Sequence, residues 1–440
     1  MNEIICDGNT QIIFMKILFG RSLYLVLSTI IVHQTSAQYL NVKIDDVSNP
    51  CEPSIAISPK NPRQLVAGAV LNRTYYSDDY GVNWHKKTLK SRFGVYGDPC
   101  VIADNEGSFY YFHLSDPENQ GWSSSLLLDR IVCQKSKNGK SWSKGVSIGH
   151  QPPKQQDKEW ATFDEKTGNI YVTWTQFDKY GSEDPNDSTH IMFTYSDDRG
   201  KSFQPAIRIN QMGGDCLDDD NTVEGAVPSV GPNGEIYVAW SLSEKIYFDK
   251  SLDGGLSWMK NDKTIASQPN GWSINIPGIG RCNGFPVTAC DLSYGDNHGT
   301  IYVNWSDQRN GEDNTDIWLI KSKDNGETWS DRIKVNDNVN TSHQFLNWMT
   351  IDQVTGIIYI VFYDRRNHDN NMTDVYLAYS TDGGDTFVNE KISTEPFEPQ
   401  NDVFFGDYNN ITAFNGHVRP IWTRMDNGKN SVWTAIIDMP

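Results

Sequence analysis

Carboxylates and arginines gather where predicted strands end, and these residue types suit the cleavage of glycosidic bonds. The charged positions are Asp98, Asp157, Lys158, Glu159, Glu224, Arg281, Asp291, Asp307, Arg309, Asp364, Arg365, Arg366, Asp407 and Arg424. Two carboxyl groups, one protonated and one ionised, can flank a glycosidic bond and break it. Asp98 and Glu224 are one candidate pair for that chemistry.

The same charged residues have a structural interpretation. Asp307 with Arg309, and Asp364 with Arg366, stand at corresponding positions of neighbouring repeats, where they could form ion pairs between blades. We favour such ion pairs as the interpretation of any one residue. For the set as a whole we predict a functional pocket, because convergent charges are costly to bury without a ligand.

A recurring four-strand unit must position these residues. Each unit reads as an apolar strand, a tight Gly/Asn turn, a strand ending in aromatic residues, a variable loop, a third strand, a turn motif and a fourth strand. Such units, about 45–65 residues long, are typical of propeller blades. Seven units are present, and the last lacks its fourth strand, which residues 39–46 can supply. We predict an all-β, seven-bladed β-propeller closed by this N-terminal strand, with a six-bladed ring as the alternative.

The turn motif is an octet, Ser-x-Asp-x-Gly-x-Ser/Thr-Trp/Phe. Its carboxylates are Asp79, Asp198, Asp253, Asp324 and Asp382, and a decayed copy has Lys137 at this position. Asp accepts hydrogen bonds from its own turn, Gly supplies a positive φ, and the aromatic residue packs beneath. We therefore assign the octets to the scaffold. The long loops, and with them the functional site, are expected at the opposite end of the propeller.

The octet resembles the Asp box, or BNR repeat, of sialidases and related β-propellers. A sialidase of this type would use Tyr408 as the nucleophile, Glu224 as its base and Asp98 as the acid/base. The resemblance also implies substrate-binding roles, which we assign to Arg281, Arg309, Arg366, Arg424, Glu159 and Trp160. The family's first arginine element, Arg-Ile-Pro, is absent, and "CEPSIAIS" stands in its place.

Three functions are consistent with these residues. The first is a sialidase-like exo-glycoside hydrolase acting on acidic or complex glycans. The alternatives are a non-catalytic propeller that binds glycan or protein, and a polysaccharide lyase, for which His150 is available. A glycan or polysaccharide is the expected partner of a monomeric chain. The net charge of −18 argues against nucleic acid. No metal or cofactor is predicted, apart from a possible structural Ca²⁺ at the acidic loop 215–221.

The N-terminal region reads as a signal peptide. Residues 1–37, with a start at Met15, hold basic residues, an apolar run too short to span a bilayer, and a small-residue cleavage site before Gln38. We predict a secreted or periplasmic protein without membrane insertion, whose single propeller domain covers residues 38–440. The mature part holds six cysteines, of which Cys282 and Cys290 are the expected disulfide pair.

Overall fold

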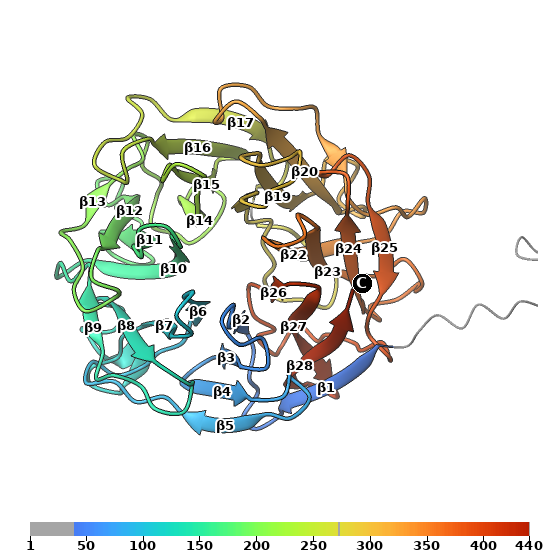
Figure 1. Ribbon diagram of the computed structural model, residues 1–440, viewed down its shortest axis with the longest axis horizontal. Helices are drawn as coiled ribbons and strands as arrows, with labels where there is room; N and C mark the ends of the chain where they lie inside the picture. Colours follow the sequence, from blue (N-terminus) through green and yellow to red (C-terminus); the bar gives the residue numbers. More distant parts are fainter. Residues whose placement is uncertain (1–38, 272, 440) are drawn as a thin grey trace, which may run out of the picture. The chain divides into compact units, whose positions relative to one another are not determined.

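The computed structural model describes residues 39–271 and 273–439, so the predicted signal peptide lies outside the described residues. Within these ranges, 28 β-strands form seven four-stranded antiparallel sheets arranged as a β-propeller (Figure 1). No helix within the described ranges is both long and apolar enough to cross a bilayer. The prediction of an all-β propeller is confirmed.

The first four blades follow the chain without interruption. Blade 1 is β2 (Ser54–Ile57), β3 (Leu65–Ala69), β4 (Arg73–Ser77) and β5 (His85–Thr88). Blade 2 is β6 (Cys100–Ala103), β7 (Phe109–Leu114), β8 (Ile131–Ser136) and β9 (Val146–Ile148). Blade 3 is β10 (Gln155–Phe163), β11 (Ile170–Phe177), β12 (Thr189–Ser196) and β13 (Ile207–Arg208). Blade 4 is β14 (Glu224–Val230), β15 (Ile236–Leu242), β16 (Lys245–Ser251) and β17 (Lys263–Ser267).

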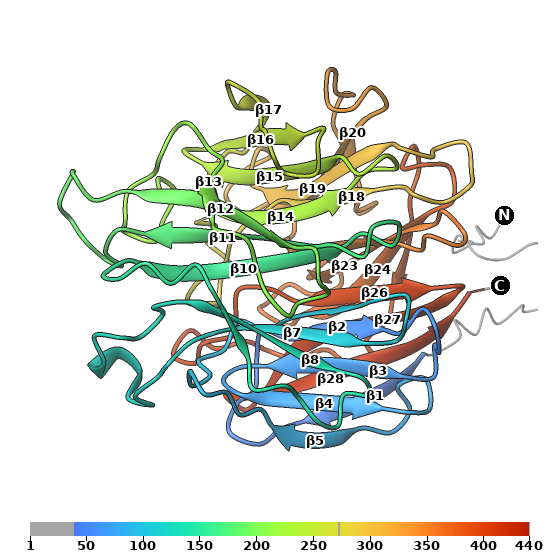
Figure 2. The ribbon, with the colours of Figure 1, turned by 60° about the vertical axis from the view of Figure 1, so that its left-hand side comes forward.

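The remaining blades continue the ring. Blade 5 is β18 (Val287–Cys290), β19 (Ile301–Asp307), β20 (Asp316–Ser322) and β21 (Ile333–Lys334). Blade 6 is β22 (Gln344–Ile351), β23 (Ile358–Asp364), β24 (Asp374–Ser380) and β25 (Val388–Lys391). Blade 7 is β26 (Asn410–Phe414), β27 (His417–Asp426), β28 (Lys429–Asp438) and β1 (Leu40–Asp45). Figure 2 shows the order within one blade, from β2 near the centre to β5 at the rim.

The second strands carry much of the core. In β11, β15, β19 and β23, β-branched and aromatic residues fit a pleated surface that neighbouring blades cover on both faces. All side chains of these four strands are buried. Each sheet therefore packs face to face with the next, and the first strands are left lining the centre of the ring.

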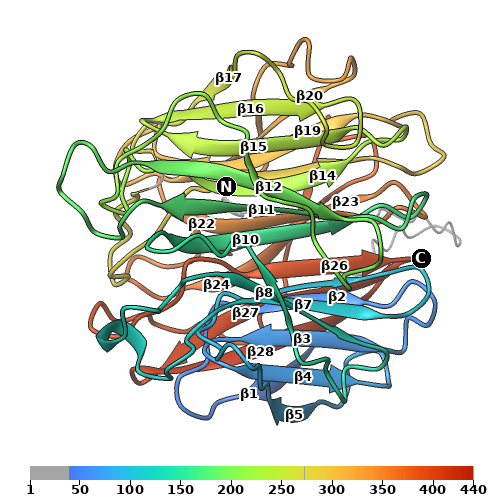
Figure 3. The ribbon, with the colours of Figure 1, turned by 90° about the vertical axis from the view of Figure 1, so that its left-hand side faces the viewer.

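The N-terminal strand closes the ring as predicted. β1 pairs antiparallel with β28, with Leu40 opposite Ile436 and Asp45 opposite Val432, at the rim of the last blade (Figure 3). β1 thereby covers an otherwise unpaired sheet edge. The seven-bladed prediction is confirmed, and the six-bladed alternative is wrong.

Deleting residues 39–46 should expose the edge of β28 and destabilise the ring. The deletion also removes the Asp45 carboxylate, which accepts hydrogen bonds from Tyr75 at 2.9 Å and from Lys86 at 2.7 Å. We expect a lower melting temperature and a broader transition by calorimetry. A truncated protein that melts like its parent would contradict closure by this strand.

The octets are turns that fasten neighbouring blades together. In the fifth blade, Ser322 Oγ donates to Asp324 Oδ1 at 2.8 Å, and the Thr328 amide donates to the same oxygen at 2.8 Å. Gly326 has φ +80°, and a Cβ there would come within 2.5 Å of the Phe248 ring of blade 4. The next aromatic residue, Trp329, packs on Phe248 with ring centroids 5.1 Å apart. These contacts support the scaffold assignment.

Candidate functional site

A residue with a positive φ recurs where the first strands reach the centre of the ring. In five blades, the second residue before the first channel-lining position has a positive φ. These residues are Glu52, Asp98, Lys158, Gly225 and Leu346. For a non-glycine residue this conformation costs about 1–3 kcal/mol, and it persists where surrounding structure enforces it, often at functional sites. Three of these five residues carry charged side chains, all on the end of the propeller opposite the octets.

Bulges in first strands accompany this feature. The register of β10 against β11 shifts between Asp157 and Trp160, and that of β14 against β15 shifts between Glu224 and Val227. A bulge re-aims the side chains that follow it. Lys158 and Glu159 lie within the first of these bulges, and Glu224 is at the edge of the second.

A buried ion-pair network, here called the central acidic cluster, fills the centre at this end. Its members are Glu52, Asp98, Asp157, Lys158, Glu159, Asp218, Glu224, Arg281 and Asp407. Lys158 Nζ lies 2.9 Å from Asp407 Oδ2 and 3.3 Å from Asp98 Oδ2. Arg281 pairs with both Asp407 and Asp218, with its Nε 2.9 Å from Asp407 Oδ1.

The two cations are held in their charged forms. Burial lowers the pKa of Lys158, but the nearby Asp407 and Asp98 carboxylates raise it further, to well above its usual value. For Arg281, burial also acts to lower the pKa, and Asp407 and Asp218 outweigh it. Burial raises the pKa of Asp407, but Lys158 and Arg281 reverse the effect, so the pKa of this carboxyl is lowered. Asp407 is therefore the ionised anchor of the cluster.

Four other carboxyls of the cluster have raised pKa values. Burial, reinforced by Asp98, raises the pKa of both Glu52 and Glu159 well above the usual value. Burial and Asp218 do the same to the pKa of Glu224. Burial raises the pKa of Asp157 to about 7, although Lys158 partly opposes the shift. A carboxyl with a pKa near neutrality is suited to donate a proton in catalysis.

Asp157 should make stability fall as pH rises. Its folded pKa of about 7 exceeds the ordinary value of 3.8, so the folded state holds a proton that the unfolded state has released. This contribution is complete below pH 3.8 and is lost as pH rises through about 7. We expect Asp157→Asn to flatten the dependence of unfolding free energy on pH in this window, by a few kcal/mol at most. Chemical denaturation across that pH range provides the measurement, and an unchanged slope would contradict the assignment.

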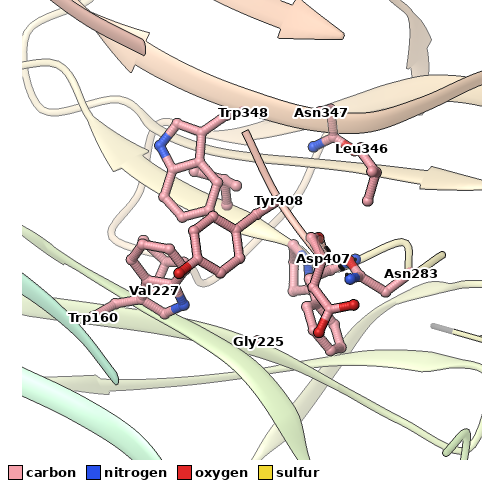
Figure 4. Close-up of a pocket in the computed structure, with 12 residues that line it drawn as sticks. Trp160, Gly225, Val227, Asn283, Leu346, Asn347, Trp348, Asp407 and Tyr408 are labelled. Atoms are coloured by element: carbon pink, nitrogen blue, oxygen red, sulfur yellow. Dashed lines mark hydrogen bonds between the residues drawn. The ribbon is translucent and has the colours of Figure 1, made fainter. Parts of the chain in front are cut away.

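An aromatic plug lies directly against the cluster. The ring centroids of Trp160 and Trp348 are 4.3 Å apart. Tyr408 packs edge-on against Trp160, with ring centroids 4.9 Å apart (Figure 4). The Tyr408 hydroxyl is buried and has no hydrogen-bond partner among the described residues. Burial, with Asp98 and Glu52 nearby, raises the pKa of Tyr408 well above its usual value. Tyr408 thus lies at the centre of the ring as a neutral packing residue.

Trp160 also differs from its predicted role. Its side chain belongs to the plug and is 6% exposed, whereas substrate stacking needs an open ring face. Beyond the plug the channel widens to a cavity of about 900 Å³, whose lining includes Glu165, Pro232 and His298 near the octet end. The plug therefore separates the acidic cluster from this second opening.

An exposed aromatic patch borders the cluster. Trp122, in the short helix η1 (Gly121–Ser123), is 62% exposed. Its ring centroid lies 5.1 Å from that of Tyr180 and 6.2 Å from that of Tyr96, which it meets edge-on. The Tyr180 hydroxyl donates to Asp218 of the cluster. An exposed aromatic face joined to buried polar groups can stack a sugar ring and hydrogen-bond its hydroxyls.

Sequence reasoning missed Trp122. The residue stands in "NQGWSS", a segment without a repeated counterpart in other blades. The available signal was a large aromatic residue flanked by Gly and Ser in a long loop. Asp116 holds this loop by accepting hydrogen bonds from the Gln120 and Gly121 amides, at 3.2 and 2.9 Å.

Three of the predicted substrate-binding arginines are engaged within their own blades, and the structure does not bring them to the cluster. Arg309 pairs with Asp307, Arg366 with Asp364, and Arg424 with Asp426. Each partner is two residues away in sequence, at the end of a second strand. Only Arg281 of the four joins the cluster, and its guanidinium already contacts Asp407 and Asp218.

The predicted catalytic pairing of Tyr408 with Glu224 is not formed. Both carboxyl oxygens of Glu224 are buried and have no hydrogen-bond partner among the described residues. The same is true of the Tyr408 hydroxyl. Glu159 shares this property, and its side chain belongs to the cluster and not to an open surface. For His150, considered for a lyase, the Nε2 atom lies 3.4 Å from Asp129 Oδ2.

Two further expectations concern the acidic loop and the cysteines. Asp215 Oδ1 accepts from Thr222 at 2.9 Å, and Asp218 pairs with Arg281. In the described ranges, no group of three or more His, Cys, Asp or Glu residues is arranged to hold a metal ion, and structural Ca²⁺ stays a prediction. The disulfide between Cys282 and Cys290 is wrong, because both thiols are free and buried in different hydrophobic clusters.

Comparison with known proteins agrees with the fold. The BNR/Asp-box repeat model matches residues 75–86, which include the first octet. Among curated proteins, no significant sequence match was found. A Dyadobacter fermentans protein of unknown function has a TM-score of 0.51 at 13% identity, covering 92% of this chain and 99% of its own.

Two carbohydrate enzymes have similar solved structures. An ulvan lyase of polysaccharide lyase family PL25, bound to a -[GlcA(1-4)Rha3S]- ligand, gives a TM-score of 0.53 at 13% identity, covering 91% of this chain and 96% of its own. The NanB sialidase of Streptococcus pneumoniae gives 0.52 at 10% identity, covering 85% and 83%. At such identities the likeness concerns the fold.

Proposed function

We propose that this chain, a sialidase-like Asp-box β-propeller, is a carbohydrate-active protein that binds a glycan at the end carrying the central acidic cluster. The observation that carries the proposal is the exposed Trp122 ring, joined through Tyr180 to the buried carboxyls. The carbohydrate enzymes on the same fold, a sialidase and an ulvan lyase, support a glycan as the ligand. Secretion through the predicted signal peptide is part of this proposal.

The arginine geometry argues against a sialidase mechanism. Holding a substrate carboxylate needs cations that are free to contact it. Arg309, Arg366 and Arg424 are paired with aspartates of their own blades. Glycan binding without turnover is accordingly the function that the site supports best.

A second candidate is glycoside hydrolysis by two carboxyls, favoured by the Asp157 pKa of about 7 beside the Asp98 carboxylate. Asp157 would give its proton to the glycosidic oxygen as the carbon–oxygen bond breaks. Asp98 would take a proton from the attacking water, so that the water oxygen joins the sugar. Asp98 replaces Glu224 in the partnership because Glu224 is fully buried.

A panel of soluble glycans tests both candidates with the purified chain 38–440. Binding without release of reducing ends supports the binding function. Release that is lost in Asp157→Asn supports hydrolysis, and a product with an unsaturated sugar would instead indicate lyase action. Absence of binding to every glycan would overturn the proposal.

A further inference from the structure

The ion pairs of the central acidic cluster leave a negative charge unmatched. Two cations, Lys158 and Arg281, form ion pairs with three aspartates, Asp98, Asp218 and Asp407. Even if the other four carboxyls of the cluster are neutral, the aspartates outnumber the cations by one. In a site of low dielectric, this excess charge favours a cationic ligand group.

A second observation points to a ligand. Glu224 is 0% exposed, and its two carboxyl oxygens have no partner among the described residues. A buried polar group without a hydrogen bond is destabilising. Glu224 also interacts electrostatically with Asp218 and Arg281, so it belongs to the same cluster. The cluster therefore has unused hydrogen-bonding capacity as well as unmatched charge.

Among the paired aspartates of the cluster, Asp98 is the one that an incoming group can best reach. Its side chain is 12% exposed, compared with 9% for Asp218 and 0% for Asp407. Lys158 contacts Asp98 through Oδ2, and Oδ1 accepts no hydrogen bond from the described residues. An ammonium group placed at Oδ1 would gain a charge-assisted hydrogen bond.

We propose that the glycan bound at this cluster is an amino sugar with a free, protonated amine, which pairs with Asp98 while the sugar ring stacks on Trp122. This inference rests on the proposed function and specifies its ligand class. An acidic sugar, by contrast, would meet an excess of carboxylates and cations that are already paired.

Isothermal titration calorimetry with three tetrasaccharides, at mildly acidic pH, distinguishes the ligand classes. They are β-1,4-linked glucosamine, its N-acetylated counterpart, in which a neutral amide replaces each amine, and hyaluronan, which carries carboxylates. We expect the glucosamine tetramer to bind about tenfold tighter than the N-acetylated one. Asp98→Asn should remove that ratio, and asparagine tolerates the left-handed backbone at this position.

A matched control removes the same charge elsewhere. Asp385→Asn, at the octet end where Asp385 pairs with Lys321, should keep the full preference. If Asp98→Asn does not fold, added salt should reduce the preference of the unaltered protein for the glucosamine tetramer over the N-acetylated one. Equal affinity for the glucosamine tetramer and its N-acetylated counterpart, or tighter binding of hyaluronan, would overturn this inference but not the proposed function. Absence of binding across the whole glycan panel would overturn the proposed function, and this inference with it.

Discussion

Replacing Lys158 with methionine should lower the free energy of unfolding by about 3–5 kcal/mol, the cost of breaking a buried ion pair from one side. Lys158 is 5% exposed and bridges Asp98 to Asp407, so the substitution leaves two buried carboxylates without this cation. Methionine has a similar length, which limits the cavity. Urea denaturation at neutral pH measures the effect.

A surface lysine provides the control for this prediction. Lys140 pairs with Asp78 at the octet end, with side chains 40% and 44% exposed, and Lys140→Met should leave the free energy of unfolding almost unchanged. The double variant Lys158→Met, Asp98→Asn should be less destabilised than the sum of its single variants, because both act on the same ion pair. Equal stability of Lys158→Met and its parent would show that the cluster does not depend on this charge.

Trp122→Ala should weaken glycan binding by about 2 kcal/mol or more, a thirtyfold loss typical of an aromatic hot spot. The ring is 62% exposed and lies at the surface, so its removal should leave the melting temperature unchanged. Titration of the best-binding glycan measures the loss, and Trp122→Phe should retain part of the affinity because the ring face remains.

Tyr294→Ala is the matched control for Trp122→Ala. Tyr294 is a fully exposed aromatic residue that lines the cavity near the octet end. Its removal should not change glycan affinity. A loss of binding in Tyr294→Ala, with binding retained in Trp122→Ala, would move the ligand site to the opposite end of the propeller.

The repeats made the fold predictable. Each octet combines a carboxylate, a glycine and an aromatic residue that one turn needs, and Asp324 and Gly326 make the expected contacts. Closure by residues 39–46 followed because a blade without its fourth strand would leave an open edge. Long loops also located the end that carries the central acidic cluster, since Asp98 and Glu224 both lie there.

Side-chain partners within the site were less predictable. Asp307 and Arg309 were expected either to form ion pairs between blades or to bind substrate, whereas they pair with each other within one blade. The left-handed backbone at Asp98 and Lys158 has no sequence signature, because neither residue is glycine. Burial of Tyr408 in the plug depends on Trp160 and Trp348 from other blades.

The location of glycan binding is the central claim, and hydrogen–deuterium exchange with and without the best-binding glycan tests it most directly. The account predicts protection in residues 115–130, around Trp122, and in residues 178–188, around Tyr180, with unchanged exchange at the tight turns 164–169 and 231–235. Protection confined to those turns, or to the octets, would contradict it.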